Sequence, residues 1–158
     1  MAKVLIIYYT RSGNTEKLAK LIEEGIKSEG VDSVLKKVQD VEPKEMLEYD
    51  GIVIGSPVYY GSVAAEIKKL FDDSVKFHSQ LDGKVGAAFS SSANIAGGNE
   101  TTILDILAAM LIHGMIIQGD PKGDHYGSVS ISTPDERAKI NAVRQGQRIA
   151  KLVKQISK

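Results

Sequence analysis

The sequence predicts an α/β domain in which helices cover both faces of a five-stranded parallel sheet. The first observation is that short apolar, β-branched runs alternate with segments whose apolar residues recur at helical spacing. The second is a loop rich in hydroxyl side chains directly after the first run, where doubly wound sheets bind cofactors. Together with right-handed crossovers, these observations favour a doubly wound sheet of strand order 2-1-3-4-5.

The first half of the chain supplies three of the strands. Residues 3–9 form a continuous β-branched and aromatic run, which is typical of a strand buried on both faces. Residues 14–28 have helical periodicity, and Gly30 stands where a helix C-terminal cap is expected. We then expect a second strand nearer the sheet edge at 31–38, a short helical turn at 42–47, a third strand at 50–55 and a helix at 64–73.

The second half supplies the remaining two strands. We expect a fourth strand at 84–90, a polar loop at 91–99, an apolar helix at 102–113, a fifth strand at 115–118 and irregular structure at 119–132. The last helix follows a capping-box pattern from Thr133 to Glu136, with Pro134 at the first helical position. No repeat or linker interrupts this pattern, so residues 1–158 are expected to form a single domain.

The composition limits the classes of function. Hydrophobic residues make up 42% of the 158 positions and charged residues 25%, which is typical of a globular protein. Twenty basic and twenty acidic residues give zero formal net charge, so we expect no nucleic-acid partner. The absence of cysteine excludes disulfides, thiolate nucleophiles and cysteine-ligated metals. No apolar run approaches the length of a membrane span, and we expect a cytoplasmic protein.

The loop after the first strand is the strongest candidate for a binding site. Backbone N–H groups and the positive end of the helix dipole converge there and favour an anion. An ordinary helix N-cap is the alternative, but four polar donors in six residues exceed what a cap requires. Its candidate phosphate-binding residues are Thr10, Arg11, Ser12, Gly13, Asn14 and Thr15.

Two further loops should meet the first at the carboxyl edge of the sheet. The loop after the third strand carries two adjacent tyrosines, against which a planar ring could lie; the alternative is that they only cover the sheet end. The loop after the fourth strand is long for its position, as functional loops often are. The candidate residues of these loops are Pro57, Val58, Tyr59, Tyr60, Gly61, Ser91, Ser92, Ala93, Asn94, Gly97 and Gly98.

The first loop resembles a known family. The pattern Ile6-Ile7-Tyr8-x-Thr10-x-x-Gly13-x-Thr15, extended through Ala19 and Ile22, agrees at every defined position with the flavodoxin FMN-phosphate signature. This resemblance implies a flavodoxin-like fold and an FMN cofactor whose phosphate is held by backbone and hydroxyl donors of residues 10–15. It covers one-electron carriers and enzymes alike, so it does not choose between them.

The third loop is similar to one branch of that family, the tryptophan-repressor-binding-protein type of FMN-dependent NAD(P)H:quinone oxidoreductases. The matching runs are 89–91, 97–100 and 113–115, continued by Tyr126 and Gly127. The resemblance implies an NAD(P)H reductant, a quinone or similar small acceptor, and a homodimer or homotetramer. The chain is shorter than typical members between the second and third strands and after the fifth, and it lacks their active-site tryptophan.

Several alternatives remain. A flavodoxin that exchanges single electrons with redox partner proteins is the main one, although carriers of that family are strongly acidic. A non-catalytic domain that uses this fold to bind other proteins is a further alternative. Tyr126 is a candidate for the second wall of the site that holds the flavin ring. The alternative is that Tyr126 only packs within its own loop. We interpret His113 as a capping or buried core histidine and His78 and His125 as surface or loop residues.

Overall fold

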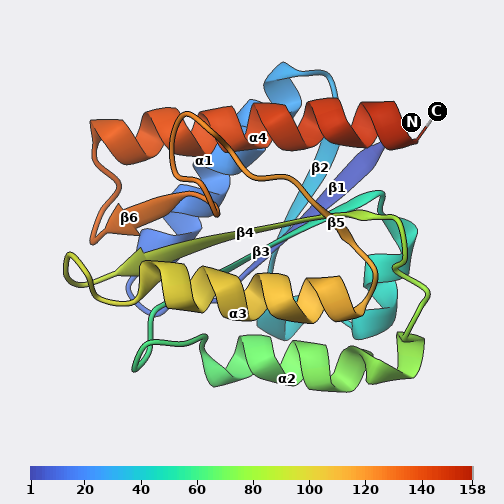
Figure 1. Ribbon diagram of the computed structural model, residues 1–158, viewed down its shortest axis with the longest axis horizontal. Coiled ribbons are helices and arrows are strands. Elements are labelled where there is room, and N and C mark those ends of the chain that lie inside the picture. Colours follow the sequence, from blue (N-terminus) through green and yellow to red (C-terminus); the bar gives the residue numbers. More distant parts are fainter. Residues whose placement is uncertain (158) are drawn as a thin grey trace.

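A computed structural model describes residues 1–157 as a parallel sheet with helices on both faces (Figure 1). The main path of the sheet has the order β2-β1-β3-β4-β5, which confirms the predicted doubly wound topology. Pairing along this path is parallel throughout. Its strands are β1 (Lys3–Tyr8), β2 (Asp32–Lys37), β3 (Gly51–Pro57), β4 (Val85–Ser92) and β5 (Ile116–Ile117).

Two helices cover each face of the sheet. Helices α1 (Asn14–Ser28) and α4 (Glu136–Ile156) pack on one face, and α2 (Ala65–Ser74) and α3 (Asn99–Ile112) on the other (Figure 1). Short 3-10 turns occur at η1 (Val38–Asp40), η2 (Pro43–Glu48) and η3 (Val75–Phe77). Helix α1 has the predicted bounds, because its apolar residues are spaced to bury one stripe against the sheet and α4.

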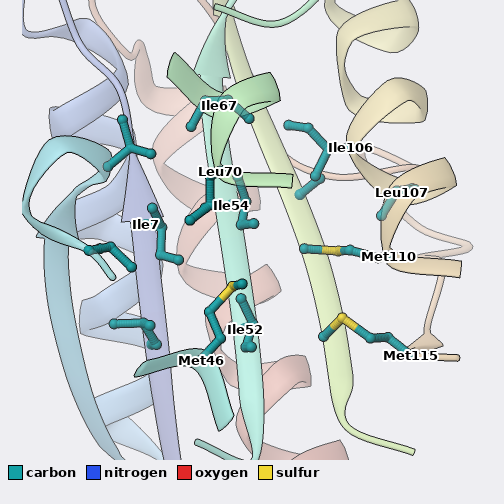
Figure 2. Packing of buried hydrophobic residues seen from close by; sticks show 14 of the residues in the cluster. Ile7, Met46, Ile52, Ile54, Ile67, Leu70, Ile106, Leu107, Met110 and Met115 are labelled. Atoms are coloured by element: carbon teal, nitrogen blue, oxygen red, sulfur yellow. The ribbon is translucent and has the colours of Figure 1, made fainter. Parts of the chain in front are cut away.

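Alternation along β1 divides the core between the two faces. Leu5 and Ile7 belong to the cluster beneath α2 and α3, whereas Val4 and Ile6 belong to the cluster beneath α1 and α4. Figure 2 shows the first cluster, in which Ile52 and Ile54 of β3 lie among side chains from the covering helices. Five side chains of these two strands are essentially inaccessible to solvent: Leu5, Ile6, Ile7, Ile52 and Ile54. β1 and β3 therefore form the closely packed centre of the fold.

The prediction of irregular structure at 119–132 is wrong at its end. Residues Val129–Ile131 form a sixth strand, β6, which pairs in parallel with the carboxyl end of β4, while β5 pairs with its amino end. β4 is eight residues long and β5 only two, so β5 leaves the far end of β4 open for another strand. Residues 118–128 form the connection between β5 and β6 on this edge.

Several element boundaries also differ from the predictions. The carboxylate of Asp135 accepts a hydrogen bond from the N–H of Ala138 (2.8 Å), so Asp135 caps α4 and Pro134 lies outside the helix. Helix α3 begins at Asn99 and β4 continues to Ser92. Ser91 and Ser92 are therefore strand residues, and the third loop is shortened to residues 93–98.

None of the helices within residues 1–157 is both long and apolar enough to cross a membrane.

Candidate functional site

The carboxyl ends of three strands bring the predicted loops together. Tyr8 of β1 lies beside Gly55 of β3, and Pro57 of β3 lies beside Ser91 of β4. A hollow of about 200 Å³ lies at this edge. Ten of the predicted residues line it, together with Ser132, which was not predicted: Arg11, Ser12, Asn14, Thr15, Pro57, Val58, Tyr59, Ser91, Ser92 and Ala93.

The first loop presents unpaired backbone donors. Gly13 is the N-cap of α1 at φ 96°, and no side chain caps the helix. The first intrahelical bond runs from the N–H of Lys17 to the carbonyl of Gly13 (3.1 Å). The N–H groups of residues 14–16 therefore have no acceptor within the helix. Thr10 holds the turn by accepting a hydrogen bond from the N–H of Gly13 (2.9 Å), so donors and helix dipole both favour an anion here.

A buried pair of hydroxyls links the first loop to β4. The side-chain oxygens of Thr15 and Ser91 are 2.8 Å apart, and both residues are almost inaccessible to solvent. Only one hydroxyl of the pair can donate to the other, so the second proton remains free for another acceptor. This pair can therefore supply one charge-assisted hydrogen bond to an anion in the hollow.

The two tyrosines of the second loop have different environments. The ring of Tyr59 packs edge-on against Tyr9, with centroids 6.2 Å apart, and its buried hydroxyl has no hydrogen-bond partner among the described residues. Burial raises the pKa of this hydroxyl, and nearby Arg11 offsets only part of the effect. Tyr60 is fully exposed, at 110% relative accessibility. Of the two, Tyr60 has the freely exposed ring, whereas Tyr59 is partly buried and lines the hollow.

A tight turn explains this division. The backbones of Tyr59 and Ser62 exchange two hydrogen bonds (2.9 and 3.2 Å), and Tyr60 and Gly61 between them have φ of 50° and 78°. Two consecutive positive φ angles are typical of a type I′ turn. A tyrosine in this conformation costs about 1–2 kcal/mol, because its Cβ approaches the following carbonyl. The turn therefore projects the Tyr60 side chain away from the sheet.

The second loop is fastened to the elements on either side of the third loop. The N–H of Val58 donates to the carbonyl of Ser91 (2.8 Å), and the hydroxyl of Thr101 donates to the carbonyl of Gly61 (2.7 Å). Gly98, the N-cap of α3 at φ 109°, lies so close that an added Cβ would be 3.0 Å from Val58 and 3.1 Å from Gly61. The predicted residues Tyr60, Gly61, Asn94, Gly97 and Gly98 lie in these loops but outside the residues that line the hollow itself.

Comparison with known proteins assigns this architecture to a family. A family model described as a flavodoxin domain matches residues 5–108, about two thirds of the chain. The chain belongs to the flavodoxin family. A flavodoxin from Clostridium saccharobutylicum is 40% identical over 161 residues, covering 98% of this chain and 99% of the relative. An NAD(P)H dehydrogenase (quinone) from Archaeoglobus fulgidus is 31% identical over 190 residues, covering 99% of this chain and 100% of the relative.

Solved structures of the flavodoxin family agree with the fold. A flavodoxin from the domain Archaea superposes with a TM-score of 0.80 at 30% identity, covering 96% of this chain and 99% of the other. A flavodoxin, WrbA-like protein from Agrobacterium tumefaciens gives a TM-score of 0.82 at 22% identity, covering 98% and 99%. The relatives thus include both flavodoxins and NAD(P)H dehydrogenases (quinone), the two kinds of protein that the sequence motifs resemble.

Tyr126 lies apart from the loop edge of this flavodoxin-family domain. It is half exposed and lines a separate small hollow with His125 and Gln145. Asp120 anchors this segment, because the guanidinium of Arg144 donates two hydrogen bonds to its carboxylate (2.7 and 2.9 Å). The structure thus does not bring Tyr126 together with the residues of the first three loops.

Ser132 is the lining residue that the sequence interpretation missed. It follows β6, and its N–H donates to the carbonyl of Ser92 (2.7 Å), which places it beside the hollow. Its position depends on the strand β6, which was also missed. The alternation of Ser128, Val129, Ser130 and Ile131 is the signal that predicts a half-buried strand.

His113 is a buried histidine, as expected. It is 7% exposed at the end of α3, and its Nε2 lies 2.8 Å from the hydroxyl of Ser74. Burial lowers its pKa, and the nearby His78 lowers it further. His78 and His125 are exposed, as predicted. No group of three or more potential metal ligands occurs among residues 1–157.

Proposed function

We propose that this protein is an FMN-dependent oxidoreductase that transfers electrons from NAD(P)H to a quinone or a similar small acceptor. The observation that carries the proposal is the hollow at the three-loop edge, where an uncapped helix start and a buried hydroxyl pair face the same space. Unpaired donors beside an open hollow favour a ligand with a terminal phosphate, because the donors need a charged acceptor. FMN meets that requirement.

The residues fit FMN in two parts. The N–H groups at the start of α1, with the hydroxyls of Ser12 and Thr15, would hold the phosphate. The Tyr60–Gly61 turn and the glycine-containing third loop would hold the ring, because both are exposed beside the hollow and Gly98 of the third loop lies close to Gly61. Arg11 lines the hollow and would contribute positive charge. When bound, FMN supplies the redox chemistry, and the protein orients the ring and limits its exposure to water.

A one-electron carrier is the second candidate function. The Clostridium flavodoxin aligns over 161 positions, almost the length of this chain, whereas the Archaeoglobus quinone dehydrogenase aligns over 190. The dehydrogenase therefore carries additional segments, and this chain has the length of the carrier. Zero formal net charge favours the enzyme instead, because a strongly acidic surface is what suits docking onto basic redox partners.

One preparation distinguishes the candidates. Purified protein is loaded with FMN, and NADH or NADPH oxidation is followed with benzoquinone and no other protein present. Sustained turnover is expected for the enzyme. Binding of FMN without turnover, together with uptake of electrons one at a time in a stepwise reductive titration, would support the carrier. A protein that binds no FMN would contradict both functions.

Two finer properties belong to the same proposal. A homodimer or homotetramer and a cytoplasmic location are what the resemblance to quinone oxidoreductases leads us to expect. Sedimentation of the FMN-loaded protein tests the first, and a monomer would contradict it. Fractionation of cells that produce the protein tests the second.

A further inference from the structure

A second hollow adjoins the three-loop site at the open edge of the sheet. Its volume is about 540 Å³, within the range of small-molecule sites. The end of the third loop, strand β6 and the start of α4 form its walls. The backbone bond from Ser132 to Ser92 (2.7 Å) closes the wall between the two hollows, because both residues line the first one. A ligand that extends past this wall would reach both sites.

Asn99 carries an unsatisfied acceptor beside this second hollow. The residue lines the hollow and is 7% exposed, and its amide nitrogen donates to the hydroxyl of Ser92 (2.9 Å). That bond fixes the orientation of the amide, because the Ser92 hydroxyl itself donates to the carbonyl of Asn94 (2.9 Å). The remaining amide oxygen of Asn99 has no partner among the described residues. Because this oxygen has almost no accessible surface, a ligand must find its hydrogen-bond acceptor elsewhere in the hollow.

Strand β6 adds a donor and an acceptor on its open side. Backbone bonds to β4 involve residues 128, 130 and 132, so the N–H and C=O groups of Val129 and Ile131 point away from β4. The N–H of Val129 is used by the carboxylate of Asp124 (3.0 Å). The N–H and carbonyl of Ile131 have no partner among residues 1–157. The exposed side chains of Ile131 and Ile95 provide apolar walls nearby.

The charges at this hollow are predominantly negative. Glu100 and Asp135 line it with exposed carboxylates, and Asp135 uses one oxygen to cap α4. Arg137, the one cation among its lining residues, forms an ion pair with Asp124. Carboxylates accept hydrogen bonds from ribose hydroxyls, and they repel a phosphate at the same position.

We infer that this second hollow binds the adenosine half of a nicotinamide dinucleotide and that it selects NADH over NADPH. A planar heterocycle with an exocyclic amine offers a donor for the free carbonyl of Ile131 and a ring acceptor for the Ile131 N–H. Apolar walls suit its faces, and the carboxylates suit an unphosphorylated ribose. The inference rests on the proposed function, because the reductant must also reach the adjoining cofactor site.

The test uses adenosine monophosphate as the probe of the FMN-loaded protein, followed by amide chemical shifts in NMR. We expect shifts at Gly97, Asn99 and Ile131. Ile131→Glu places a charge on an exposed wall and should weaken binding about tenfold or more. The matched control is Ile140→Glu, an exposed isoleucine of α4 outside both hollows, which should leave binding unchanged.

Cofactor selectivity supplies the second readout. NADH should bind more tightly than NADPH by about tenfold, and Glu100→Gln should narrow that ratio. Absent shifts at these residues, unchanged binding in Ile131→Glu, or equal affinity for both dinucleotides would overturn the inference. FMN binding is measured in a separate experiment, by the yellow colour of the bound flavin. Protein that binds FMN but not adenosine monophosphate refutes this inference alone, and protein that binds no FMN refutes the proposed function.

Discussion

Replacing Thr15 by valine tests the phosphate site with a minimal change of shape. Valine has nearly the size of threonine but no hydroxyl, so the variant removes one polar atom from the hollow. Thr15 is 2% exposed and pairs with Ser91 at 2.8 Å. The substitution therefore removes the pair that would donate to the phosphate, while the backbone N–H groups at the start of α1 remain.

The expected loss of affinity follows from the charge of the acceptor. A hydrogen bond to a charged group contributes about 1.5–3 kcal/mol, which corresponds to a Kd for FMN about 10- to 150-fold weaker. The free energy of unfolding without FMN should fall as well, by about 1–3 kcal/mol, because the Ser91 hydroxyl is left buried without a partner. Ser12→Ala should weaken FMN binding further if that hydroxyl is also a ligand.

The assay is a titration of FMN with FMN-free protein, followed by the quenching of flavin fluorescence. Thr102→Val is the matched control, because Thr102 is fully buried on α3 and its hydroxyl has no partner among the described residues. Removing that hydroxyl should leave FMN affinity unchanged and the protein equally or more stable. FMN affinity within twofold of wild type in the Thr15→Val, Ser12→Ala double variant would refute the placement of the phosphate.

Three further predictions concern other residues. Tyr60→Asn should lower FMN affinity, because the stacking of one aromatic ring contributes about 0.5–1.5 kcal/mol. The protein should stay equally stable, because asparagine tolerates the positive φ of this position. Unchanged affinity in the flavin titration would show that Tyr60 does not contact FMN. The pKa of Asp120 is lowered from 3.8 to about 2, chiefly by the hydrogen bonds from Arg144. The stability that this carboxylate contributes is present above about pH 4 and should disappear as the pH falls toward 2. Acid unfolding of Asp120→Asn should lack this pH-dependent loss of stability. Burial lowers the pKa of His113, so the unfolded chain binds a proton at this residue more readily than the folded chain. The free energy of unfolding should therefore decrease as the pH falls below about 6.5. His113→Gln, which can still bond to Ser74, should show a smaller decrease when the free energy is measured by urea unfolding.

Most of the fold could be predicted from the sequence because the strongest signals are local. Apolar spacing gave the bounds of α1, and the alternation of strands and helices gave the parallel sheet and its order. Parallel strands end at one edge, so the three loops could be placed side by side without knowledge of any contact. The hollow formed by Arg11, Thr15, Val58, Ser91 and their neighbours follows from that placement.

Features that depend on distant contacts could not be predicted in this way. β6 has only three residues. Residues 128–131 alternate, but the open edge with which they pair exists because β4 extends beyond β5, which no local pattern reveals. Tyr126 is held away from the loop edge in a segment anchored by the Asp120–Arg144 ion pair, between residues 24 positions apart. The opposite directions of Tyr59 and Tyr60 result from a type I′ turn, which the sequence does not indicate at tyrosine.

The most direct test of the account is an NMR titration of the FMN-free protein with FMN, in which the backbone amides that shift are identified. We expect saturation at one FMN per chain, with the largest shifts at residues 11–16 and further shifts at 58–61 and 92–98. The amides of Asp120 to Tyr126 should change little. Absence of binding, or shifts confined to residues 120–126, would contradict the claim that FMN binds at the three-loop edge.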